Sequence, residues 1–77
     1  MKASLEFFGQ LTDISREKTI EITDVRDTNG ILERVYELFP GLKSANFVMA
    51  VNNNIINQNM ELTDDCSIAL MPPYSGG

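Results

Sequence analysis

The chain has 77 residues, enough for one small domain, and a domain of this size buries only about 60% of its unfolded surface, which leaves little room for an enclosed substrate cavity. Six Lys and Arg residues against eleven Asp and Glu residues give a net charge of -5, which disfavours binding to nucleic acids and to anionic lipid surfaces; a basic protein surface is the more natural partner. The absence of histidine excludes Ser-His-Asp and Cys-His nucleophilic centres and histidine-ligated metal sites.

The single cysteine argues against a disulfide-stabilised secreted domain, because Cys66 has no partner for an internal disulfide. No signal-peptide pattern follows Met1 and no apolar run approaches the length of a membrane-spanning helix, so we expect a cytoplasmic protein. The preceding Asp64 and Asp65 oppose formation of a thiolate, and we expect Cys66 to be an ordinary strand residue.

Two strands are predicted near the N-terminus, over residues 2–8 and 18–23. Both segments alternate apolar and polar residues, which is the period of a strand with one buried face. Phe8 breaks the alternation and points to the opposite face from Phe7. We expect the two strands to form a hairpin joined by a polar connection over residues 9–17.

A helix is predicted in the segment DTNGILERVYELFPGL, where the apolar spacing changes to three and four residues. Asp27 or Thr28 can cap its start, and Pro40 with Gly41 ends it. The apolar stripe consists of Ile31, Leu32, Val35, Leu38 and Phe39. This stripe predicts an amphipathic helix with one buried side.

Three further strands are predicted in the second half of the chain. The segment FVMAV, residues 47–51, is apolar on both faces, as expected of a strand flanked by others and covered on one side by the helix. Residues 52–54 are asparagines and predict a turn, because asparagine tolerates left-handed backbone. A short strand IIN follows at residues 55–57, and after a turn in LTDDC a last strand, SIALM, covers residues 67–71.

The predicted order is strand, strand, helix, strand, short strand, strand, which gives an α+β domain with one mixed sheet and one helix packed across one face. We expect this domain to cover residues 1–71 and an extended tail to cover residues 72–77. The helix is expected to cover the face that carries Leu5, Phe7, Ile20, Ile22, Ile68 and Leu70. Phe8, Met71 and part of FVMAV then lie on the uncovered face, where clustered apolar groups usually mark a protein-protein contact.

The ending MPPYSGG predicts an extended arm. Pro72 and Pro73 cannot donate to a strand ladder and hold the preceding residues extended, so the chain leaves the sheet here. The tail reaches on the order of 20 Å beyond the domain. Gly76 and Gly77 lack side chains, which lets a narrow channel admit the terminal carboxylate. We therefore expect the carboxylate of Gly77 to be the reactive group, activated by another protein because no phosphate-binding loop is present in this chain.

Three segments together carry a family resemblance: LEFFGQL near the N-terminus, AVN at residues 50–52 and the ending LTDDCSIALMPPYSGG. With these segments the chain resembles the small subunit of molybdopterin synthase, the ubiquitin-like sulfur carrier of molybdenum-cofactor biosynthesis. The most specific part is the final strand followed by Pro-Pro, an aromatic residue, Ser, Gly and Gly. The resemblance covers essentially the whole chain and implies a ubiquitin-like β-grasp fold.

The resemblance also implies a sulfur-carrying role for the tail. A ubiquitin-activating-type enzyme would adenylate the terminal glycine, here Gly77, and a sulfurtransferase system would convert it to a thiocarboxylate. The tail would then enter the large subunit of a heterotetrameric molybdopterin synthase, where the sulfur attacks cyclic pyranopterin monophosphate to help form the molybdopterin dithiolene. The chain itself would be a non-catalytic subunit that binds no cofactor and no metal, while the activating partner uses ATP.

The candidate site follows from this resemblance and from the uncovered face. Gly77 is its reactive residue, and Phe8, Met71 and Tyr74 are the candidates for apolar contact with the large subunit. The residues that deliver Gly77 are Pro72, Pro73, Tyr74, Ser75 and Gly76.

Three other functions stay open from the sequence. The thiazole-synthesis sulfur carrier shares the fold, the terminal Gly-Gly and the thiocarboxylate chemistry, although its members usually lack Pro-Pro before the tail. A ubiquitin-like protein modifier would use the same acyl adenylate at Gly77 to form isopeptide bonds with lysines. A β-grasp interaction domain with an inert tail is the third alternative.

Overall fold

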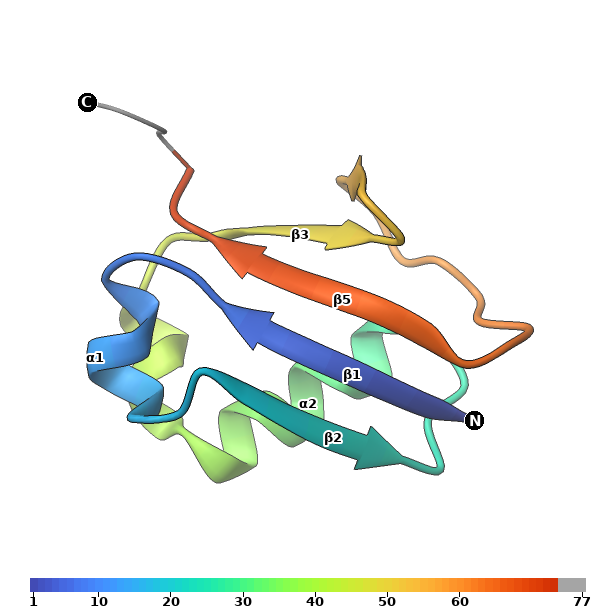
Figure 1. Ribbon diagram of the computed structural model, residues 1–77, viewed down its shortest axis with the longest axis horizontal. Coiled ribbons are helices and arrows are strands. Elements are labelled where there is room, and N and C mark those ends of the chain that lie inside the picture. Colours follow the sequence, from blue (N-terminus) through green and yellow to red (C-terminus); the bar gives the residue numbers. More distant parts are fainter. Residues whose placement is uncertain (74–77) are drawn as a thin grey trace.

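The computed structural model describes residues 1–73 of the chain (Figure 1). In chain order the elements are β1 (Lys2–Phe7), α1 (Leu11–Ser15), β2 (Thr19–Thr23), α2 (Thr28–Leu38), the 3-10 helix η1 (Pro40–Ser44), β3 (Val48–Val51), β4 (Asn54–Ile56) and β5 (Cys66–Met71). Within residues 1–73, no helix is both long enough and apolar enough to cross a membrane.

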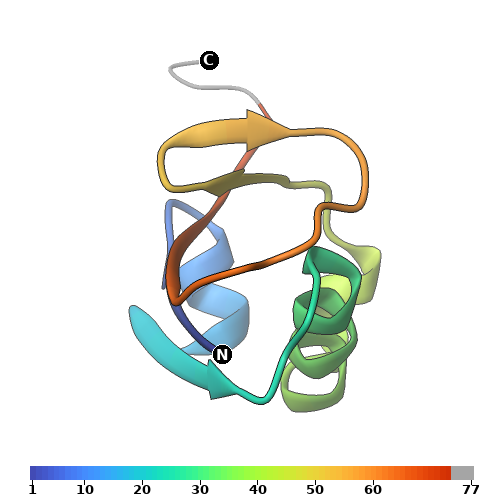
Figure 2. The same cartoon turned by 90° about the vertical axis from the view of Figure 1, so that its right-hand side faces the viewer.

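The strands form one mixed sheet in the order β2-β1-β5-β3-β4. The neighbouring strands β1 and β5 are parallel, whereas β2 pairs with β1, and β3 pairs with β5 and β4, in antiparallel fashion. Helix α2 lies on one side of the curved sheet (Figures 1 and 2). The expected α+β arrangement, with a mixed sheet and a helix across one face, is therefore confirmed.

The hydrophobic core lies between α2 and the face of the sheet that α2 covers. Leu5 on β1 is paired with both Ile20 on β2 and Ile68 on β5, so one apolar row crosses three strands. Phe7 contacts the ring of Phe39 edge-on, with centroids 5.6 Å apart. The predicted core face is confirmed: Leu5, Phe7, Ile22, Ile68 and Leu70 are buried, and Ile20 is partly buried. Each such Leu, Ile or Phe contributes about 1.5–3 kcal/mol to folding when it is removed from water.

Helix α2 begins and ends where the sequence predicts. The Asp27 carboxylate accepts a hydrogen bond from the backbone N–H of Gly30 at 2.8 Å, which caps the first turn. Ile31 and Val35 are fully buried, as their spacing predicts. Leu38, which the apolar stripe also placed in the core, is 51% exposed. The core positions at this end are taken instead by Phe39 and by residues of η1, because the chain changes direction at the end of α2.

The connection over residues 9–17 is not only a polar loop, because it contains helix α1. Leu11 on this helix is 3% exposed and belongs to the core. The Ser15 hydroxyl is buried and donates to the carbonyl oxygen of Glu17 at 2.8 Å. The helix ends at Arg16, whose left-handed backbone stops it. Five residues are too few to display the periodicity from which a helix is recognised in a sequence.

The predicted turn between the third and fourth strands is present but shorter than expected. Asn52 and Asn53 have φ values of 48° and 72°, the conformation of a two-residue hairpin turn with positive φ at both positions. Asn54 is the first residue of β4 and pairs with Val51. β3 pairs on both sides, as its doubly apolar pattern predicts.

The loop between β4 and β5 is fastened to the start of α2 by hydrogen bonds, one of which runs from the Asn59 side-chain N–H to the Asp27 carboxylate at 3.3 Å. The Asn59 side-chain oxygen accepts hydrogen bonds from the backbone N–H of Asn29 at 2.8 Å and from the Thr28 hydroxyl at 3.2 Å. The Thr28 N–H donates to the carbonyl oxygen of Met60 at 3.0 Å, and the Met60 N–H donates to the Thr28 hydroxyl at 2.9 Å. Asn59 therefore satisfies a donor that the first turn of α2 cannot satisfy itself.

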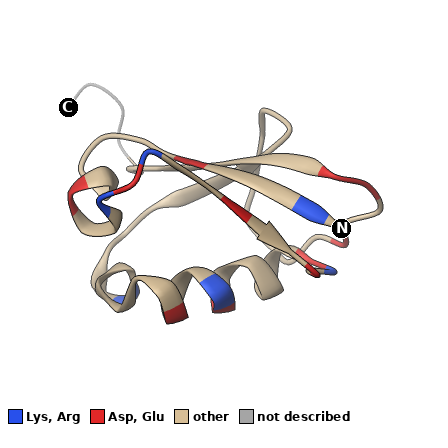
Figure 3. Ribbon diagram, turned by 60° about the horizontal axis from the view of Figure 1, so that its bottom comes forward, with Lys and Arg blue, Asp and Glu red and all other residues tan. Residues whose placement is uncertain are grey.

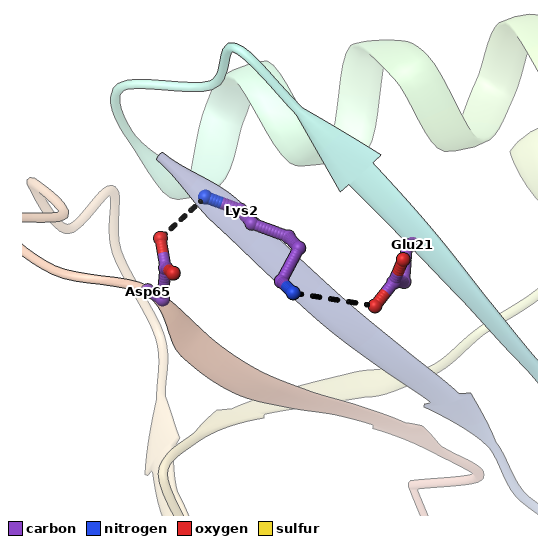
Figure 4. Close-up of polar contacts among 3 residues, drawn as sticks. All are labelled: Lys2, Glu21 and Asp65. Carbon is purple, nitrogen blue, oxygen red and sulfur yellow. Dashed lines mark hydrogen bonds and ion pairs between the residues drawn. The ribbon is translucent and has the colours of Figure 1, made fainter.

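Charged groups also make contacts at this end of the sheet, where β1 begins (Figure 4). The backbone N–H of Lys2 donates to the Asp65 carboxylate at 2.8 Å, which ties β1 to the turn before β5. The Lys2 ammonium lies 3.6 Å from the Glu21 carboxylate on β2. Both side chains of this ion pair are about half exposed or more, so the pair contributes roughly 0–1 kcal/mol.

Candidate functional site

The face of the sheet opposite α2 carries one row of side chains that runs through all the strands. Residues opposite each other in neighbouring strands project to the same face. The row from one sheet edge to the other consists of Ile55 on β4, Ala50 on β3, Ala69 on β5, Glu6 on β1 and Thr19 on β2. It is apolar at the β4 end and polar at the β2 end.

The apolar part of this face is extended by residues at the end of β5. Met71 is paired with Val48, one step along the strands from Ala50 and Ala69. Phe8 follows β1, is 40% exposed, and donates its N–H to the carbonyl oxygen of Leu70 at 3.0 Å. We call this surface the apolar outer face, and its members are Phe8, Val48, Ala50, Ile55, Ala69 and Met71. The structure thus places the sequence-predicted contact residues Phe8 and Met71 at the same end of the sheet.

The apolar outer face borders on Glu6, which is paired with Ala69, but the β3–β4 hairpin itself carries no charged side chain. The sequence contains no Lys, Arg, Asp or Glu between Lys43 and Glu61, and none after Asp65. Figure 3 shows acidic and basic residues on α1, α2, β1 and β2, whereas the hairpin of β3 and β4 carries none. In a chain with a net charge of -5, this separation leaves the β3–β4 edge of the sheet suited to uncharged contacts.

The predicted tail begins at the apolar outer face. β5 ends at Met71, Pro72 is partly buried, and Pro73 is exposed. Pro72 and Pro73 line a shallow depression of about 520 Å³ together with Gln10, Leu11, Ile14, Ala45 and Asn46. Figure 1 shows the last described residues leaving the tip of β5 beside the turn that follows β1. The predicted site residues Tyr74, Ser75, Gly76 and Gly77 lie outside the described residues.

Cys66 lies at the opposite end of β5 from the tail. Burial raises the pKa of the Cys66 thiol, and the neighbouring Asp65 carboxylate raises it further. The side chain is partly buried and packs against the core. The neutral thiol is therefore favoured at neutral pH, in agreement with the expectation that Cys66 is an ordinary strand residue.

A groove of about 460 Å³ lies between α2 and the β3–β4 hairpin, with Leu32, Tyr36, Phe47 and Ile56 in its wall and asparagine side chains at its rim. Its lining contains no Asp, Glu, Lys, Arg or Cys, so it offers no carboxylate, cationic or thiol group. Among residues 1–73, no three acidic or cysteine side chains gather as a metal site would require. The candidate site is therefore the apolar outer face with the tail.

Ile55 is the member of this site that sequence analysis missed. It is 67% exposed, the largest exposed fraction among the large hydrophobic residues described. The signal was present in the alternation of the short strand, since Ile56 is partly buried and Ile55 must face the other way. Which face Ile55 occupies depends on the register with β3, and a three-residue strand does not reveal its register.

Comparison with solved structures identifies the fold of the protein. The chain has a TM-score of 0.84 to a putative molybdopterin converting factor, subunit 1, from Pyrococcus furiosus, at 17% identity over 96% of this chain and 99% of that one. The TM-score to SAMP1 from Haloferax volcanii is 0.83, at 18% identity over 100% of both chains. It is 0.72 to a chain of the complex of subunits 1 and 2 of the molybdopterin-converting factor from Helicobacter pylori, at 28% identity over 100% of both chains. The protein has the ubiquitin-like β-grasp fold, as the sequence resemblance implied.

The family follows from the sequence itself. The profile of the ThiS family matches residues 5–77, which is nearly the whole chain. The protein belongs to the ThiS family and has the fold of its sulfur carriers. No curated protein sequence matches the chain.

Proposed function

We propose that the protein is the sulfur-carrying small subunit of a molybdopterin synthase. Its reactive group is the carboxylate of Gly77, which receives sulfur as a thiocarboxylate and passes it to cyclic pyranopterin monophosphate in the large subunit. The observation that carries the proposal is the junction at Met71, where the last strand leaves an apolar, uncharged face and continues through Pro72 and Pro73 toward Gly76–Gly77.

The chemistry requires partners, because the described residues offer no catalytic centre. A carboxylate is a poor electrophile, so a separate ubiquitin-activating-type enzyme would join it to AMP and release pyrophosphate from ATP. Sulfur at the oxidation level of hydrosulfide then forms a bond to the Gly77 carbonyl carbon and expels AMP. The product is an anionic thiocarboxylate, whose soft sulfur is the nucleophile, as a thiolate is in cysteine chemistry.

The large subunit would be held by the apolar outer face. Phe8 and Ile55 are exposed and Met71 is partly buried in this apolar surface, and Tyr74 is proposed to continue it along the tail. The likeness to a chain from the complex of subunits 1 and 2 of the Helicobacter pylori factor supports a partner of this kind. The large subunit would supply the basic groups for the substrate phosphate, which this acidic chain does not provide near its tail.

Intact mass spectrometry tests the proposal directly. The purified chain is incubated with the activating enzyme, ATP and sulfide, then mixed with the large subunit and cyclic pyranopterin monophosphate. We expect one oxygen of Gly77 to be replaced by sulfur, and this sulfur to disappear as the dithiolene product forms. A tail that never gains sulfur, or one whose sulfur the pterin does not remove, contradicts the proposal.

Deletion of Gly77 is the matched control for this experiment. The shortened chain should gain no sulfur, because the remaining Gly76 carboxylate stops one residue short of the activating centre. Its melting temperature should equal that of the full chain, since the last residues of a chain usually contribute little to packing. A truncated chain that melts much earlier, or that accepts sulfur as before, shows that Gly77 has another role.

Two further candidates, a protein modifier and a sulfur carrier of the thiazole pathway, are each favoured by one specific observation. The chain is similar to SAMP1, the small archaeal modifier protein 1, over its full length, and it belongs to the family named after ThiS. The same Gly77 adenylate can be attacked by a lysine amine, which forms an isopeptide bond and releases AMP. Covalent adducts of the chain with other proteins in cell extracts would favour a modifier, and rescue of a thiamine-requiring strain would favour the thiazole pathway.

A further inference from the structure

The turn after β1 is fixed on both sides. The N–H of Phe8 donates to the carbonyl oxygen of Leu70 at 3.0 Å, which attaches the turn to β5. The carbonyl oxygen of Gly9 accepts from the backbone N–H of Thr12 at 3.2 Å and from its hydroxyl at 2.7 Å, which attaches the turn to α1. Gly9 has a φ of +58°, a left-handed conformation that glycine adopts without strain.

Pro72, the first residue beyond β5, packs on the bare backbone of Gly9. A Cβ atom added to Gly9 would lie 2.9 Å from Cγ and 3.4 Å from Cδ of the Pro72 ring. The shorter distance is well below the roughly 3.5–4.0 Å of a favourable carbon-carbon contact. The ring closes on the backbone nitrogen, so it cannot turn aside as a flexible side chain would. Any side chain at residue 9 must therefore move either the turn or the start of the tail.

We propose that Gly9 is a positioning residue that sets the direction in which the tail leaves the sheet. The inference rests on the proposed function, because the direction matters only if Gly77 must enter another protein's active site. The turn cannot yield easily, since it is bonded to both β5 and α1, and so the displacement falls on Pro72. From Pro73 to Gly77 the chain spans up to about 17 Å, so a change of angle at Pro72 is magnified at the carboxylate.

Variants at residue 9 can separate backbone strain from the contact with Pro72. Gly9→Ala introduces both, because alanine disfavours positive φ and its Cβ meets the ring. Gly9→Asn introduces mainly the contact, because asparagine tolerates left-handed backbone. Pro72→Ala removes the two ring atoms that the new Cβ would approach. The double variant Gly9→Asn/Pro72→Ala therefore keeps the added side chain but relieves the contact.

The experiment measures kcat/KM for sulfur loading of Gly77 by the activating enzyme, ATP and sulfide, at a temperature below the melting point of every variant. We expect Gly9→Asn to lower kcat/KM about tenfold in the native background and less than about twofold in the Pro72→Ala background. A purely structural role would give equal losses in both backgrounds. Gly30→Ala is the control, because its added Cβ would meet Asp27 Oδ1 at 3.2 Å, at the start of α2 and not at Pro72, and kcat/KM should stay within about twofold of the wild type.

The outcomes distinguish this inference from the function on which it rests. Gly9→Asn loading as fast as the wild type, or a loss that persists in the Pro72→Ala background, overturns the positioning role alone. A wild-type chain that gains no sulfur overturns the proposed function, and the positioning role with it. The inference is supported if the nuclear Overhauser contact between the backbone of residue 9 and the Pro72 ring is lost in Gly9→Asn, and if kcat/KM for sulfur loading is restored in the double variant.

Discussion

The two ends of one cross-strand row differ in chemistry although they share the same sheet face. At the β4 end the row holds Ile55, Ala50 and Ala69, and at the β2 end it holds Glu6 and Thr19. Both ends are edge strands, and no helix of residues 1–73 covers either of them on this face. The fold alone therefore does not require one end to be apolar.

The comparison of the two ends shows on which part of the sheet apolar side chains face outward. A polar outer face is the ordinary state of a sheet with one solvated side, and the β1–β2 end follows it. The β3–β4–β5 end departs from it next to the point where the chain leaves Met71 for the tail. An interface at this position would suit the proposed function, because docking of the face would bring the tail to the mouth of the partner's site.

The largest expected effect comes from placing a charge on the apolar end. Ile55→Glu should weaken binding to the large subunit roughly 30-fold, or by about 2 kcal/mol, because the interface would bury an unpaired carboxylate. Ile55 is 67% exposed in the free chain, so the melting temperature should change little. Isothermal titration of the loaded carrier into the large subunit measures the affinity.

Two matched variants make this comparison specific. Thr19→Glu places the same charge at the opposite end of the same row, and Leu38→Glu places it on an exposed leucine of α2. Both should bind the large subunit as tightly as the wild type. Equal weakening by all three variants would mean that net charge, rather than the apolar outer face, governs binding.

A smaller effect is expected from the hydrogen bonds that hold the β4–β5 loop. Asn59→Ala removes an acceptor for the Asn29 N–H and the Thr28 hydroxyl and a donor to the Asp27 carboxylate, and should lower the free energy of unfolding by about 1–2 kcal/mol. Urea denaturation measures this loss. Asn57→Ala, at an exposed asparagine of the same loop, should change stability by less than about 0.5 kcal/mol. Equal losses in the two variants would show that Asn59 has no special anchoring role.

Local patterns predict this fold well where an element is long and its period regular. The alternation in β1 and the stripe that contains Ile31 and Val35 identify a buried strand face and a helix, and both are present. α1 and η1 escaped prediction because each has only five residues, too few for a period, although Leu11 and Leu42 are buried core residues. Their burial depends on contacts that are distant in sequence.

The candidate site could be predicted from the sequence only in part. Phe8 and Met71 could be placed on the uncovered face from alternation alone, because each neighbours a core residue in its strand. The packing of Gly9 against Pro72 could not, since it joins two turns separated by most of the chain and depends on the parallel pairing of β1 with β5. Sequence indicates what a tail can do, and the fold determines where it starts.

Cys66 allows a chemical comparison of the two ends of β5. The proposed function assigns sulfur chemistry to the tail after β5 and none to the thiol of Cys66, which lies beside the acidic turn before β5. Because burial and Asp65 raise the pKa of Cys66, less thiolate is present at neutral pH than in a model peptide. Alkylation at neutral pH should therefore be slower than that of a free cysteine peptide and should accelerate as pH rises. Cys66→Ser should gain sulfur at Gly77 at the wild-type rate, and loss of loading in this variant would assign a role to the thiol.

The smallest effect is expected from the ion pair of Lys2 and Glu21, near the start of β1. Lys2→Gln removes an ion pair of 3.6 Å between exposed side chains and should lower the free energy of unfolding by less than about 1 kcal/mol. The backbone bond from residue 2 to Asp65 does not depend on the side chain and should persist. The loss should shrink as salt is added, because added ions screen exposed charges. A salt-independent loss in Lys2→Gln would mean that its aliphatic stem, rather than its charge, stabilises this end of the sheet.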